Sequence, residues 1–194
     1  MNQNEQNKEM TAQESLSLIS EMLNNSRRII LQNNAKHFML WGILLTVTSL
    51  VIYELWHITG NPIWNCAWFA MPALGFPIVR ILDRKNTDVP QNVINKQLGL
   101  IWLTYCIFAV SISVIAMLAV PMNISLVIAV LLGFAECISG FLLKNWAITI
   151  GGFILGIGGA IFASMVYNEA QLLIFTLGGI ILVVTGLIIK FQYK

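Results

Sequence analysis

The sequence predicts an all-α polytopic membrane protein with six transmembrane helices, arranged as three hairpins and preceded by a cytoplasmic amphipathic helix. The chain is 57% hydrophobic and only 10% charged, a balance that the surface of a water-soluble domain of 194 residues would not tolerate. A helix rising about 1.5 Å per residue needs about 20 apolar residues to cross roughly 30 Å of hydrocarbon. Six stretches meet this requirement, over residues 37–56, 63–82, 97–119, 123–143, 145–167 and 170–191.

The distribution of Lys and Arg predicts the orientation of these helices. If the six stretches cross the membrane in turn, all 11 Lys and Arg residues fall on the side of the N-terminus. The opposite connections, residues 57–62, 120–122 and 168–169, contain none. Cytoplasmic segments of membrane proteins hold the excess of Lys and Arg, so both termini are expected in the cytoplasm.

The N-terminal segment contains the predicted amphipathic helix over residues 11–36, after a polar tail over residues 1–10 that we expect to be disordered. Thr11 and Glu14 fit a capping box at the start of the helix. The apolar residues from 16 to 30 share an arc of about 160°, with Glu14 and Glu21 on the other face. Helices that adsorb to anionic lipid usually have Lys and Arg there. Docking against the bundle of residues 37–194, or in the groove of a partner protein, is therefore at least as plausible as adsorption.

The second span is interrupted by Pro72 and Pro77, which lie on either side of Gly75. Each proline lacks a backbone N–H and frees a carbonyl four residues earlier, at Trp68 and Ala73. Broken helices of this kind form ion and substrate sites in transporters. Prolines are also common in spanning helices whose neighbours satisfy the freed groups, so a plain kink is the simpler interpretation. A polar loop over residues 83–96 then separates the first hairpin from the other four spans.

Small residues in the last three spans predict close contacts between helices. The glycines concerned are Gly133 and Gly140 in the fourth span, Gly152, Gly156 and Gly159 in the fifth, and Gly179 and Gly186 in the sixth. Positions 133, 140 and 144 match positions 179, 186 and 190 at a constant offset of 46 residues, the length of one helical hairpin. Duplication of a hairpin and convergence on the same residue types both explain this offset.

Glu136 is the candidate intramembrane polar site. It precedes Lys144 by eight residues, which places it about 12 Å from the predicted cytoplasmic end of its helix. A carboxylate at this depth is costly and usually faces a protein interior or a water path. Arg80 is the expected partner in an ion pair or hydrogen bond, and Tyr105 or a hydroxyl on a neighbouring helix is the alternative. A structural contact between helices and a proton or cation site are the two interpretations.

At the outer end of the first span, Glu54 and His57 lie one turn apart and form a candidate pH-sensitive pair. The sequence predicts no enzyme, because the two histidines, His37 and His57, lie at opposite ends of one span, about 30 Å apart. No HExxH, GxSxG or glycine-rich phosphate loop is present. No cofactor or metal site is expected, since the three cysteines lie within spans without CxxC spacing. The net charge of +2 gives no support for nucleic-acid binding.

Leu40-Trp41-Gly42 at the start of the first span, with the glycine-rich fourth to sixth spans, resembles the uncharacterised small six-span bacterial membrane proteins that begin with a short amphipathic helix. The resemblance implies the bacterial inner membrane and assigns no functional residue. We expect a non-enzymatic accessory or sensory component that engages a cytoplasmic or membrane partner, or a second copy of itself. The alternative is a small oligomeric transporter or channel for a proton, cation or small solute that uses Glu136 and the proline-broken second helix.

Overall fold

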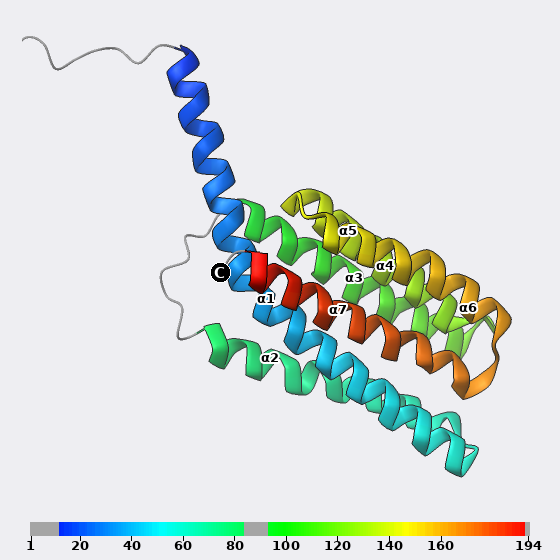
Figure 1. Ribbon diagram of the computed structural model, residues 1–194. Helices are drawn as coiled ribbons and strands as arrows, with labels where there is room; N and C mark the ends of the chain where they lie inside the picture. The colour runs from blue at the N-terminus through cyan, green and yellow to red at the C-terminus, as the bar shows by residue number, and fades with distance from the viewer. Residues whose placement is uncertain (1–11, 84–92, 193–194) are drawn as a thin grey trace, which may run out of the picture.

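The computed structural model describes residues 12–83 and 93–192, and every element within them is helical (Figure 1). This confirms the all-α class, and six of the helical stretches in the described residues are long and apolar enough to cross a membrane. The elements are α1 (Ala12–Thr59), η1 (Pro62–Phe69), α2 (Ala70–Asp83), α3 (Val93–Leu118), α4 (Ile124–Leu143), α5 (Trp146–Phe153), η2 (Ile154–Gly158), α6 (Gly159–Met165), η3 (Asn168–Leu172) and α7 (Leu173–Gln192). The predicted tail, the capping residue Thr11 and most of the predicted loop lie outside the described residues.

The first span and the predicted amphipathic helix are one continuous helix, α1, of 48 residues. The sequence suggested two helices that meet near residue 36. Neither Gly nor Pro occurs between residues 12 and 41, so nothing in this part of the chain ends the helix. Ile30, Leu31 and Ala35 are already buried in the bundle. The earlier turns of α1 project beyond the other helices (Figure 1).

The most extensive helix contact joins the two ends of the chain. α1 makes its most extensive contacts with α7, so the first and last apolar stretches lie side by side (Figure 1). α4 makes its most extensive contacts with α5, the next helix in the chain. The contact between α3 and α4, which are also consecutive, is less extensive. Glycines explain the preference, because they let two helix backbones approach closely.

The irregular part of the second apolar stretch precedes the prolines, whereas the sequence suggested a break around Pro72, Gly75 and Pro77. Its first eight residues, η1, form a 3-10 helix that begins at Pro62 and is capped by the Asn61 side chain. The Trp68 carbonyl, which Pro72 leaves without its helical donor, accepts a hydrogen bond from the backbone N–H of Ala70. Neighbouring residues thus satisfy the freed group, and α2 continues through Pro77 to Asp83.

The fifth span contains a π-helix that the sequence analysis did not predict. α5 and α6 are joined without a break by η2, a π-helical turn over Ile154–Gly158. Gly156 of η2 lies against Gly133 of α4, so the two backbones meet at this turn. A π-turn changes which residues face a neighbouring helix, and such turns are frequent at functional sites.

The core consists of two separate apolar clusters. The larger one joins α1, α4, η2, α6, η3 and α7 and includes Leu132, Leu155 and Leu182. The smaller one lies at the end where α3 and α5 begin and includes Leu143, Ile148 and Ile189. Trp68 of η1 packs against the larger cluster. Its ring meets that of Phe175 edge to face, with 5.4 Å between the centroids.

Candidate functional site

Glu136 lies on α4 between the two apolar clusters, and its side chain has an exposed fraction of 0%. The glycines at positions 133 and 140 are also buried and face α5. Residues three and four apart lie on one face of a helix, so Glu136 faces the same neighbour. The sequence therefore orients the carboxyl toward the interior of the bundle, as expected from its cost in lipid.

The Glu136 carboxyl lies against a glycine of α5. An ideal Cβ placed on Gly151 would lie 2.9 Å from Oε1 of Glu136. The same point is 3.1 Å from Cγ2 of Ile181 and 3.5 Å from Oγ1 of Thr185, both on α7. Gly151 thus leaves the room that the carboxyl fills, and the site is formed by α4, α5 and α7.

Neither carboxyl oxygen of Glu136 has a hydrogen-bond partner within the described residues, and both atoms are buried. The predicted contact with Arg80 is therefore wrong. Arg80 is exposed near the end of α2, which packs against α1 and η1, whereas Glu136 points toward α5 and α7. Tyr105 does not take the place of Arg80. Its ring lies beside that of Trp102, and both pack against the larger apolar cluster.

Several small polar side chains are buried at the same level of the bundle, and most bond to their own backbone. The Ser139 hydroxyl donates to the Ala135 carbonyl at 2.8 Å, and the Thr149 hydroxyl donates to the Asn145 carbonyl at 3.2 Å. The Cys137 thiol donates to the Thr149 carbonyl at 3.4 Å. These groups form a polar layer between the apolar clusters, and Glu136 is its one acidic member among the buried residues.

The proline-broken region does not belong to this site. Gly75 lies against the Trp41 ring of α1, which fills the space beside it. Pro72 and Pro77 flank this contact on α2. The two halves of the predicted transport site, Glu136 and the broken second helix, are thus on different helix interfaces.

The predicted packing glycines lie at two interfaces within the chain. Gly133 faces Gly152 and Gly156, and Gly140 faces Thr149, so α4 and α5 meet through small residues. Gly159 lies against Ala129 of α4 and Ile174 of α7. At the second interface, Gly179 of α7 faces Gly42 and Thr46 of α1, and Gly186 faces Ala35 and Met39. Glycines that match in the 46-residue offset therefore pack on different helices, α5 and α1.

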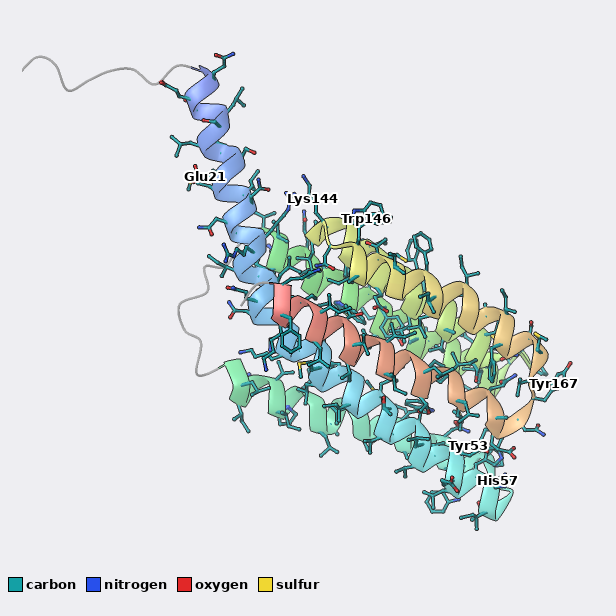
Figure 2. All side chains as sticks on the ribbon, in the orientation of Figure 1. Glu21, Tyr53, His57, Lys144, Trp146 and Tyr167 are labelled. Carbon is teal, nitrogen blue, oxygen red and sulfur yellow. The ribbon has the colours of Figure 1, made fainter. Side chains whose placement is uncertain are left out.

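The outer pair differs from the expected one. His57 Nδ1 lies 3.1 Å from Oε1 of Glu169, at the start of η3, and its ring stacks on that of Tyr53. The predicted partner Glu54 is exposed on α1. The hydrogen bond with His57 lowers the pKa of Glu169, which precedes the last apolar stretch. Figure 2 shows Tyr53 and His57 at one end of the bundle and Lys144 and Trp146 at the other.

Sequence reasoning found the acidic residue of the site but not its surroundings. Nothing in the sequence indicated that Gly151 and Thr185 would meet at Glu136, because the contact depends on how three helices are rotated. Within residues 12–83 and 93–192, no group of three His, Cys, Asp or Glu side chains is placed to hold a metal ion.

No protein-family model, curated protein or solved structure matches this chain. The resemblance to small six-span bacterial membrane proteins therefore stays a prediction.

Proposed function

We propose that this protein is a non-enzymatic, multi-pass component of the bacterial inner membrane, with both termini in the cytoplasm, that engages a partner protein through the projecting part of α1. We call this part, residues 13–26, the α1 extension. The observation that supports the proposal most directly is its apolar stripe. Leu16, Ile19 and Met22 are 66%, 55% and 65% exposed, although they recur at the spacing of a buried helix face.

The continuity of α1 favours a protein partner over the lipid surface. A helix that adsorbs to a membrane lies in the plane of the headgroups. The α1 extension continues the first span without a break, so it points away from the membrane over about 20 Å, at about 1.5 Å per residue. Its apolar stripe is thereby held where only another protein can cover it. An amphipathic helix of this kind packs into an apolar groove through residues at positions i, i+3 and i+7.

A pull-down with matched variants tests this proposal. Leu16→Asp with Leu23→Asp places two charges in the stripe, and Ser17→Asp with Asn24→Asp places them on the polar face at the same spacing. Both double variants are expected to accumulate in the membrane, because all four side chains are exposed. Extraction of the full-length chains in mild detergent should recover the same partner with wild type and with the control, and lose it with the stripe variant.

Two outcomes contradict the proposal. A partner that stays bound to the stripe variant would show that the α1 extension is not the contact surface. Recovery of a second copy of this chain as the sole bound protein would assign the stripe to self-association. The composition of the complex, measured by mass spectrometry and light scattering, separates these outcomes.

Accessibility of single cysteines tests the membrane topology separately. Ile58 and Tyr167 are exposed at one end of the bundle, and Gln192 is exposed at the end of α7. In a variant without native cysteines, a membrane-impermeant thiol reagent applied to intact cells should modify Ile58→Cys and Tyr167→Cys but not Gln192→Cys. The reverse pattern would overturn the orientation inferred from the positions of Lys and Arg.

The transporter alternative is supported by one observation, the buried carboxyl of Glu136. It would use the interface of α4, α5 and α7, without the proline region of α2. Ion flux in proteoliposomes that is present in wild type and lost in Glu136→Gln would establish it. Equal, background flux in both would exclude Glu136 as a transport site.

A further inference from the structure

We propose that Glu136 is a proton-binding site at the junction of α4, α5 and α7, and that its carboxyl is in the neutral, protonated form in the folded bundle. The proposal does not depend on a partner for the α1 extension. It rests on the burial of the carboxyl, on its surroundings and on the missing hydrogen-bond partners described above.

An ionised carboxyl that is fully buried needs an opposite charge or several hydrogen-bond donors, because the apolar surroundings do not replace its hydration. Within the described residues, neither oxygen of Glu136 has a donor or a cation at hydrogen-bonding distance. Taking up a proton removes the charge and so most of this cost. The proton comes from water, and the neutral acid can then donate its own O–H.

The helices packed against α4 carry few ionisable groups. The ionisable groups on these elements are Lys96, Tyr105 and Cys106 on α3 and Lys190 on α7, with Cys137 and Lys144 on or next to α4 itself. None of them forms a hydrogen bond with Glu136. α5, η2 and α6 contain no ionisable side chain. No neighbouring charge is therefore placed to keep Glu136 ionised.

The site beside Glu136 suits a proton better than a metal ion. Calcium takes six to eight oxygen ligands and magnesium takes six in a nearly octahedral arrangement. Oγ1 of Thr185 and Oε1 of Glu136 both lie within 4 Å of an ideal Cβ on Gly151, and within residues 12–83 and 93–192 no group of three His, Cys, Asp or Glu side chains is placed to hold a metal ion. The neighbouring backbone carbonyls Ile150 and Gly151 accept from the N–H of Ile154 within the helix. One carboxyl and one hydroxyl are enough to hold a proton but not such a cation. The Thr185 hydroxyl lies beside the same point of Gly151 as the acid but is not within hydrogen-bonding distance of its oxygens.

Deprotonation would place a charge between the two apolar clusters. The carboxylate would need water or a donor that the close contact between α4 and α5 does not admit. Loss of the proton is therefore expected to loosen α4 from α5 and α7. Stability that the neutral acid provides is present at low pH and is lost as the pH rises through its titration.

Infrared difference spectroscopy of the purified full-length protein tests the proposal. The spectrum of wild type minus Glu136→Gln at neutral pH should contain the C=O stretch of a protonated carboxyl, which shifts in D₂O and disappears on alkalinisation. Gln has the shape of the neutral acid, so this variant should fold. Gly151→Ala should shift the band, because its methyl group would approach Oε1 of Glu136. Gly158→Ala should leave the band in place, since nothing lies within 4 Å of a Cβ at that position.

Three results would overturn the proposal. The first is a carboxylate signal from Glu136 at neutral pH in place of the acid band. The second is loss of the acid band when Na⁺, K⁺ or Ca²⁺ is added at constant pH, which would assign the site to a metal cation. The third comes from thermal unfolding over a range of pH. Wild type should lose stability relative to Glu136→Gln as the pH rises, and a constant difference between the two would show that Glu136 takes up no proton on folding.

Discussion

Glu136 on α4 and Gly151 on α5 fit together as a side chain and the space left for it: a Cβ at position 151 would lie 2.9 Å from Oε1 of the carboxyl. This relationship decides where the acid of the fourth span points. It directs Glu136 to α5 and α7 and away from Arg80, the partner that charge alone would select.

The absence of this ion pair makes a direct prediction for a double-mutant cycle. Arg80→Leu and Glu136→Leu should be additive to within about 0.5 kcal/mol, as is usual for residues without shared partners. Glu136→Leu by itself should be neutral or stabilising, because it replaces a buried polar group without partners by an apolar one. Unfolding in detergent measures all three variants. A coupling of 1 kcal/mol or more by this cycle would mean that the two side chains meet.

The contact between α4 and α5 should tolerate no added side chain. A Cβ on Gly152 would lie 2.6 Å from the backbone nitrogen of Cys137, and backbone cannot move aside as a side-chain end can. Gly152→Ala is expected to cost about 1–3 kcal/mol, the usual range for overpacking. Gly158→Ala is the control, because a Cβ there meets no atom within 4 Å. Equal stability of the two variants would contradict the packing of α4 on α5.

A short hydrogen bond between two side chains joins α1 and α7. Ser49 of α1 is fully buried, and its hydroxyl lies 2.6 Å from that of Thr176 on α7. In a cycle of Ser49→Ala and Thr176→Val, we expect a coupling of about 0.6 kcal/mol, the mean for hydrogen bonds between membrane helices. Thermal unfolding of the four proteins gives this value. The bond would be contradicted if the stability lost in the double variant equalled the sum of the losses in the two single variants.

The contact of His57 with Glu169 predicts a loss of stability in acid. Because the hydrogen bond lowers the pKa of Glu169 in the folded protein, its contribution is present above the unfolded pKa and is lost as the pH falls through the folded pKa. Glu169→Gln should reduce this part of the pH dependence. Glu54→Gln should not, since His57 contacts Glu169 and not its predicted neighbour. Melting temperatures between pH 3 and pH 7 compare the variants, and a larger effect of Glu54→Gln would restore the original pairing.

The sequence by itself determined the class of this fold and the six apolar helical stretches that are long enough to span a membrane. Length and apolarity are local properties, and six stretches of about 20 apolar residues have few alternatives to helices in lipid. The sequence also identified Glu136, because an acid within an apolar helix is costly wherever the helix lies. It also identified the packing glycines, because small residues permit two helix backbones to approach closely whichever helix is the partner.

Only the tertiary structure decided which helices meet. The pairing of α1 with α7, the place of Gly151 beside Glu136 and the choice of Glu169 by His57 all join residues distant in the chain. They depend on the rotation and tilt of each helix, which follow from packing many side chains at once. The unbroken α1 and the π-turn in the fifth apolar stretch were also not predicted from the sequence. A short segment follows its neighbours when nothing in its own sequence stops it, and the apolar pattern by itself does not show where one helix ends.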